Sequence, residues 1–148
     1  MVRARPGPHR PSRPPPRVDK LTHQRGIDVN GSKAASDRAR ELGLEDLRTY
    51  CWHCPIMGKH RKQFLWEHHK PVADMRNEIY SMGPKVRLEE VAAILGKTRI
   101  AWVLQSEGKK LGNKSRPNPA ATYRDAGVVL LYPWDKCRPI DRKRHRAP

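Results

Sequence analysis

Residues 88–111 read LEEVAAILGKTRIAWVLQSEGKKL, and the interpretation of this stretch decides the fold class. Apolar side chains recur at helical intervals in its first half, so the pattern predicts a helix over 88–95 that ends near Gly96. A second short helix is expected over 99–107. Because the apolar residues of that second segment are nearly continuous, a buried helix and a strand both fit its pattern.

The same stretch resembles the helix-turn-helix segment of small DNA-binding regulators and excisionases. Ala92 is small where two helices would cross closely, Gly96 suits the turn, and Thr98 suits the cap of the second helix. The resemblance implies DNA binding, with base edges and phosphates contacted by Lys97, Arg99, Gln105, Lys109 and Lys110. An ordinary pair of core helices is the alternative.

The rest of the chain is predicted to be mainly helical. Ser32 suits the N-cap of a helix that stops at Gly43, and Pro71 suits the start of another. The remaining expected elements are helices over 44–50, 58–69, 72–82 and 120–126 and one strand over 128–132. We therefore expect a mainly α fold: a helical nucleic-acid-binding domain over 32–134, after a disordered Pro/Arg-rich arm over 1–31 and before a basic tail over 135–148.

A cluster of cysteines and histidines indicates a metal site within residues 51–71, CWHCPIMGKHRKQFLWEHHKP. Cys51 and Cys54 have the two-residue spacing that lets both thiolates face one zinc ion from a tight turn. His68 and His69 are the candidate further ligands, with Cys137 as another. We expect a structural zinc at this turn; the alternative is that the cysteines are small buried residues and the histidines belong to a basic helix.

The sequence EHHKP after the CxxC resembles the His-containing strand of HNH endonucleases. This resemblance implies a metal-dependent nuclease in which His68 or His69 activates water and Asn77 is the family's asparagine. The family also needs a metal-ligating histidine on the following helix, and no histidine occurs between His69 and His145. A nuclease is therefore the alternative to a binding protein, and a non-catalytic protein is favoured.

Charge is the strongest indication of a partner. The chain of 148 residues has 31 Lys+Arg and 15 Asp+Glu, a formal net charge of +16. Such a charge attracts polyanions, so nucleic acid is the expected partner, with DNA favoured over RNA because of the helix-turn-helix-like segment. A structural component of a ribonucleoprotein is a further alternative. With neither a bilayer-spanning apolar run nor a signal-peptide pattern, we expect a cytoplasmic protein.

Overall fold

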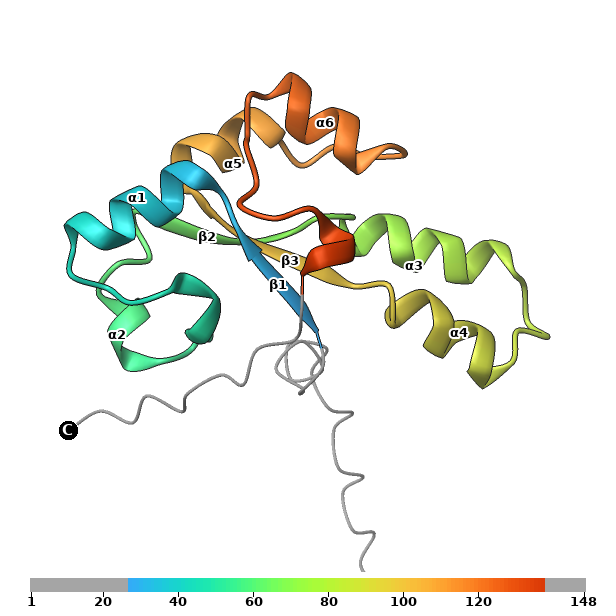
Figure 1. The fold of residues 1–148 in the computed structure, drawn as a ribbon. Helices are drawn as coiled ribbons and strands as arrows, with labels where there is room; N and C mark the ends of the chain where they lie inside the picture. The colour runs from blue at the N-terminus through green and yellow to red at the C-terminus, as the bar shows by residue number, and fades with distance from the viewer. Residues whose placement is uncertain (1–26, 138–148) are drawn as a thin grey trace, which may run out of the picture.

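A three-stranded mixed sheet forms the centre of the computed structural model, which describes residues 27–137 (Figure 1). The strands are β1 (Asp28–Gly31), β2 (Phe64–His68) and β3 (Arg99–Leu104), in the spatial order β1-β3-β2. β1 pairs with β3 in parallel, and β2 pairs with β3 in the antiparallel sense. The helices are α1 (Lys33–Glu41), α2 (Pro55–Gly58), α3 (Val72–Ser81), α4 (Leu88–Leu95), α5 (Gln105–Leu111) and α6 (Pro119–Asp125), with 3-10 turns η2 (Leu47–Thr49) and η3 (Trp134–Lys136).

The central strand β3 carries the largest fully buried side chain, Trp102. The ring centroid of Trp66 on β2 lies 4.7 Å from that of Trp102, and those of Trp52 and Phe64 lie at 5.8 and 6.5 Å. Such tilted and edge-on arrangements are favourable for aromatic pairs. Trp102 therefore joins the sheet to the segment that contains the two close-spaced cysteines.

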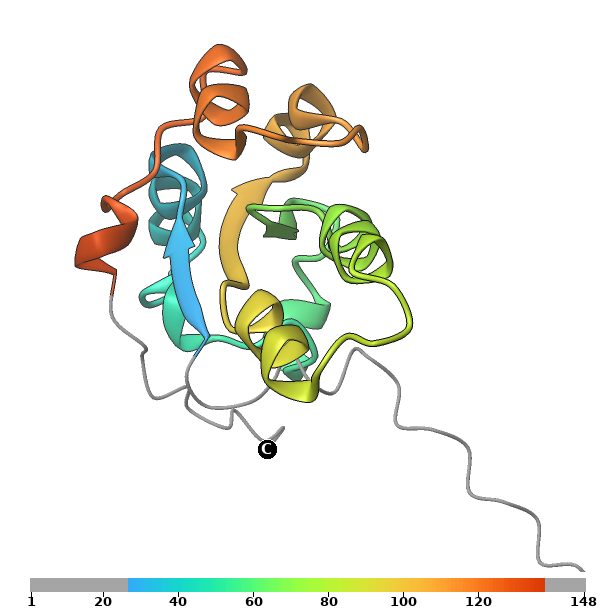
Figure 2. The same ribbon diagram turned by 90° about the vertical axis from the view of Figure 1, so that its right-hand side faces the viewer.

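Two separate cores cover the two faces of the sheet. Because side chains alternate along a strand, Phe64 and Trp66 face the larger core, which includes α1, η2 and the start of α2. Leu65 faces the smaller core, which is closed by α5, α6 and the segment after α6. Figures 1 and 2 show α5 and α6 together on one side of the sheet, with the α3–α4 hairpin extending from one end of it. The smaller core is the one that borders the cleft described below.

The expectation of a mainly α fold is wrong, because residues 99–104 form the central strand and not a helix. A continuous apolar run is what a strand buried on both faces requires, since both sets of alternating side chains pack against protein. In place of the expected pair of helices, the chain forms helix α4, then strand β3, then the short helix α5. The second helix of the helix-turn-helix interpretation does not form.

Two further assignments are also wrong. Residues 58–69 were expected to form one basic helix, but α2 ends at Gly58, a series of turns follows, and β2 occupies Phe64–His68. The strand expected over 128–132 is reduced to an isolated bridge between Leu130 and Ser32. Both differences follow from tertiary pairing, because β2 gains its hydrogen bonds from β3, whereas 128–132 meets only the edge of β1.

Several local predictions are confirmed. Ser32 caps α1, with its Oγ accepting a hydrogen bond from the amide of Ala35 at 3.0 Å, and Gly43 follows the helix with a positive φ of 70°. The helices expected from Pro71 onward and over 88–95 are α3 and α4.

Residues 28–31, which the sequence placed in the N-terminal arm, form β1. Most of that arm and of the C-terminal tail lies outside the described residues. Within them, no helix is long and apolar enough to cross a membrane.

Candidate nucleic-acid interface and ligand cleft

Five exposed cations gather where β2 begins and β3 ends. Three come from the turns before β2 and two from α5: Lys59, Arg61, Lys62, Lys109 and Lys110. The side-chain amide of Gln105 joins the two segments, because its Nε2 donates to the carbonyl oxygens of Arg61 at 3.0 Å and Phe64 at 3.1 Å. The backbone amide of Gln105 also donates to the carbonyl of Gln63 at 2.9 Å. We call these five cations the basic end of the sheet.

Close packing holds α5 against β2 at this point. A Cβ atom built on Gly108 would lie only 2.4 Å from Cδ2 of Leu65, so only glycine lets the helix approach the strand this closely without movement of Leu65. Arg61 is fixed from the other side, with its guanidinium 5.3 Å from the ring centroid of Trp52 and its Nη2 donating to the Trp52 carbonyl at 3.3 Å. The basic end is therefore built on anchored segments.

The charges at the basic end are not neutralised within the described part of the chain. Elsewhere in residues 27–137, eight Lys or Arg side chains form ion pairs with carboxylates, including Arg38 with Glu41 on the neighbouring helix α1. None of the five cations of the basic end makes such a pair there. Five exposed cations without a described ion pair favour binding of an extended polyanion.

The five residues predicted to bind nucleic acid are divided between the two ends of β3. Gln105, Lys109 and Lys110 lie together at the basic end, where Gln105 has a structural role. Lys97 precedes β3 and Arg99 is its first residue, and the guanidinium of Arg99 lies 5.5 Å from the ring centroid of Trp134. The sequence reading did not assign Lys59, Arg61 and Lys62 to binding. The sequence feature that could have indicated these three residues is the basic run KHRK at 59–62. This run lies beside α5 only because β2 pairs with β3.

A buried ion pair lies on the face of the sheet that α5 and α6 cover. Nη2 of Arg116, a residue only 3% exposed, lies 2.6 Å from Oε1 of Glu67 on β2. The same guanidinium donates to the carbonyl oxygens of His68 at 2.9 Å and Gly112 at 2.7 Å. These contacts attach the connection between α5 and α6 to the sheet.

A cleft of about 400 Å³ opens next to this ion pair, between α6, the segment after it and the end of β2. Its aromatic lining is formed by His69, Tyr123, Tyr132 and Trp134. The His69 ring lies between two of the others, with its centroid 5.0 Å from that of Tyr123 and 4.9 Å from that of Trp134. The hydroxyl of Tyr123 and Nε1 of Trp134 are buried without a hydrogen-bond partner among the described residues.

The imidazole of His69 is neutral near pH 7. Burial, followed by the positive charges of Arg99 and Arg116, lowers the pKa of His69 from 6.5 to about 4. Burial also raises the pKa of Tyr123, and the carboxylate of Glu67 raises it further. Both side chains therefore reach the cleft as uncharged groups that can make hydrogen bonds.

The residues predicted to bind metal are not brought together. Cys51 and Cys54 are neighbours, and burial followed by the adjacent Cys51 thiol raises the pKa of Cys54. His68 lies four residues beyond the start of β2, about 13 Å along the strand. Within residues 27–137, no three or more His, Cys, Asp or Glu side chains are grouped as metal ligands. The zinc-bound turn of the expected fold is thus corrected to a turn that packs on the core through Trp52.

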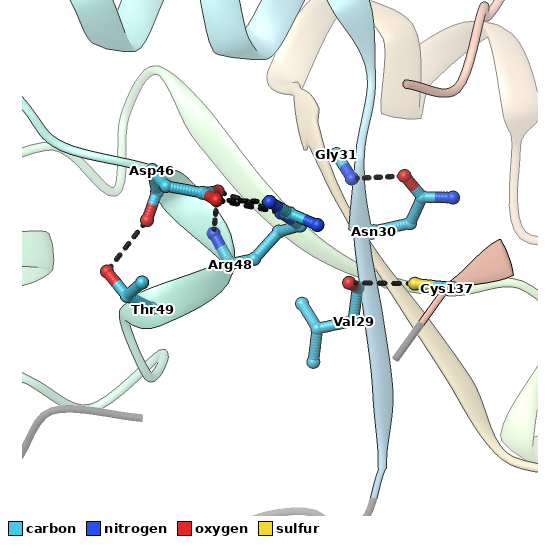
Figure 3. A network of polar contacts seen from close by, with 7 residues as sticks. All are labelled: Val29, Asn30, Gly31, Asp46, Arg48, Thr49 and Cys137. Carbon is cyan, nitrogen blue, oxygen red and sulfur yellow. Dashed lines mark hydrogen bonds and ion pairs between the residues drawn. The ribbon is translucent and has the colours of Figure 1, made fainter. Parts of the chain in front are cut away.

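Cys137, the other candidate ligand, belongs to a different contact. Its Sγ lies 3.1 Å from the carbonyl oxygen of Val29 and donates to it, as Figure 3 shows. Beside this contact, Asp46 pairs with Arg48, whose guanidinium lies 4.5 Å from the ring centroid of Tyr132. Cys137 therefore fixes the chain after η3 to β1.

The candidate nuclease residues occupy different environments. His69 lies in the cleft, whereas the preceding His68 points to the opposite face of the sheet and has its Nε2 buried without a described hydrogen-bond partner. Asn77 is exposed on α3. This arrangement does not favour a shared catalytic site.

Comparisons with known proteins give no independent indication of function. No family model matches the sequence, and no curated protein or solved structure matches it either. The functional argument therefore depends on the surface and the cleft.

Proposed function

We propose that the protein binds nucleic acid and that the basic end docks on the phosphate backbone. The observation that carries this proposal is the gathering of Lys59, Arg61, Lys62, Lys109 and Lys110 without a carboxylate partner in the described part of the chain. Each cation that neutralises a phosphate releases a condensed counterion, which increases the binding affinity. This contribution to the affinity decreases as the salt concentration rises.

The overall distribution of charge supports the same proposal. Residues 27–137 contain 19 Lys+Arg and 13 Asp+Glu, so that segment has a net charge of +6. The flanking residues 1–26 and 138–148 carry the other +10 of the total of +16. In this account the flanks add affinity for any polyanion, whereas the basic end sets the face of the domain that approaches it.

A pair of matched triple variants tests the proposal. The first replaces Lys62, Lys109 and Lys110 with glutamine, and leaves Arg61 in place because it packs on Trp52. The control replaces Arg76, Lys85 and Lys136 with glutamine, which are exposed cations outside the basic end without a described ion pair. Both variants lower the formal net charge of the full chain from +16 to +13.

Binding to labelled duplex DNA is measured over a range of salt concentrations. If all three lysines contact phosphates, the slope of log K against log salt falls by about 2.7 in the first variant. The control keeps a slope close to that of the unaltered chain. Equal losses in the two variants would show that only net charge matters and would contradict the proposed face.

The choice between DNA and RNA is part of the same experiment. The preference for DNA came from the helix-turn-helix resemblance, and residues 99–104 are a strand. We retain DNA as the first probe and use a structured RNA of similar length as the comparison. Tighter binding to the RNA at equal salt would replace DNA by RNA and would favour the ribonucleoprotein alternative.

A further inference from the structure

The cleft beside His69 has the chemistry of a site for a flat heterocycle. Its volume of about 400 Å³ lies within the range of roughly 300–1,000 Å³ that is usual for small-molecule sites. Aromatic side chains form much of its lining, and aliphatic side chains such as Val128 and Leu130 complete it. Stacking on aromatic rings is the interaction by which proteins hold unpaired bases regardless of sequence.

Unpartnered polar groups at the cleft provide a second and independent indication. Tyr123 is only 2% exposed, yet its hydroxyl has no hydrogen-bond partner among the described residues, and neither has Nε1 of Trp134. A buried donor without a partner costs free energy, which a ligand would recover when a small movement of the ring presents the buried atom to the cleft. The donor and acceptor edge of a nucleobase can supply such bonds.

Cations at the rim suit the phosphate that accompanies a base. Arg124 lines the cleft, and Arg99 lies over the ring of Trp134. Lys114, which is exposed, lies in the connection from α5 to α6, between Lys110 of the basic end and the helix that borders the cleft. A strand bound at the basic end could therefore follow cations along this connection.

We infer that the cleft formed by His69, Tyr123 and Trp134 binds one unpaired nucleobase. This inference rests on the proposed function and deepens it, because it identifies single-stranded nucleic acid, or a nucleotide, as a ligand of the domain. The neutral state of His69 near pH 7 is consistent with this role, since a neutral ring needs no counter-charge in the cleft.

The test compares ligands that differ only in the base. The full chain is titrated with a short labelled oligothymidylate and with an abasic strand of the same length and charge. In parallel, adenosine monophosphate is compared with ribose 5-phosphate by calorimetry. We expect the oligothymidylate to bind roughly fivefold or more tightly than the abasic strand, the lower end of what one stacked base contributes.

Two variants connect the preference to the cleft. Trp134→Leu removes one aromatic wall, and Ala120→Leu fills space at the exposed start of α6, where Ala120 lines the cleft. Both should reduce the preference for bases to nearly none. Ala93→Leu, a matched change on the exposed part of α4, should keep it. Circular dichroism of each variant confirms that it is folded.

The outcomes separate this inference from the proposed function. Binding of the abasic strand reports the basic end alone. If that strand binds but neither base-containing ligand is preferred over its base-free partner, the cleft proposal fails and the proposed function stands. A preference that survives in both cleft variants would also overturn it. If no strand binds while adenosine monophosphate binds more tightly than ribose 5-phosphate, the proposed function fails and a free nucleotide is the ligand of the cleft.

Discussion

The buried pair between Glu67 and Arg116 gives the sharpest stability prediction. Glu67→Leu would leave the guanidinium of Arg116, which is 3% exposed, without its carboxylate. Removing one partner of a buried pair costs about 3–5 kcal/mol in general. Because the Glu67 side chain is 19% exposed and Arg116 keeps two carbonyl acceptors, we expect the lower part of that range, about 3 kcal/mol.

A double-mutant cycle distinguishes loss of the pair from loss of packing. Arg116→Met would leave Glu67 unpaired and is also expected to destabilise the fold. Replacing both residues with apolar ones removes the uncompensated charge, so the double variant should be more stable than the sum of the two single losses predicts, by about 2 kcal/mol.

Urea unfolding, followed by circular dichroism and tryptophan fluorescence, measures each free energy of unfolding. The exposed pair of Lys33 with Asp37 on α1 is the control, and its cycle should show far weaker coupling. Strictly additive losses for Glu67 and Arg116 would refute the claim that this pair attaches the α5–α6 connection to the sheet.

Three further predictions follow from single contacts. The pKa of His69 is lowered from 6.5 to about 4, so between these values the unfolded chain binds more protons than the folded chain. Because the ring is partly solvated and its charge interactions are screened, we expect stability to fall by about 1 kcal/mol from pH 7 to pH 5 in urea titrations. His69→Gln should flatten this fall. Ser32→Ala removes the N-cap of α1 and also the hydroxyl that donates to Oε2 of Glu107 over 2.5 Å. Thermal and urea unfolding should show that the free energy of unfolding falls by about 2 kcal/mol. A change near zero would contradict the buried contact. Gly108→Val should destabilise by about 1–3 kcal/mol because its Cβ meets Leu65, and the added change Leu65→Ala should restore part of that loss in the same assay.

Local signals in the sequence correctly predicted α1, α3, α4 and α6, but not the sheet, because helices were expected over 58–69 and 99–107, where β2 and β3 lie. Ser32 and Gly43 mark the two ends of α1: Ser32 caps the helix with its side chain, and Gly43 adopts a positive φ. Both effects depend on neighbouring residues only. β3 has no alternating pattern because both of its faces are buried, so its apolar run fits a buried helix equally well. β2 is short and follows a basic run, and its partner β3 begins about thirty residues later along the chain. The residues around β2 therefore do not indicate that it pairs with β3.

The candidate site shows the same contrast between features that local sequence predicts and features that depend on contacts between distant segments. Lys109 and Lys110 were predicted to bind nucleic acid from their place in a supposed helix-turn-helix, and they lie at the basic end for a different reason, the packing of α5 on β2. The run containing Lys59 and Lys62 could join them only after β2 was recognised as a strand. Nothing local marks Tyr123 as part of a cleft, because its neighbours there come from the end of β2 and from the segment after α6. Zinc binding by the full chain stays a prediction for metal analysis.

The most direct test of the central claim is a map of the contacted face. Backbone amide signals of the ¹⁵N-labelled full chain are followed during titration with a short duplex DNA. The account predicts the largest shifts at residues 59–62 and 109–110, and smaller ones on the α3–α4 hairpin. Shifts that are largest over residues 72–95, with none at the basic end, would contradict it.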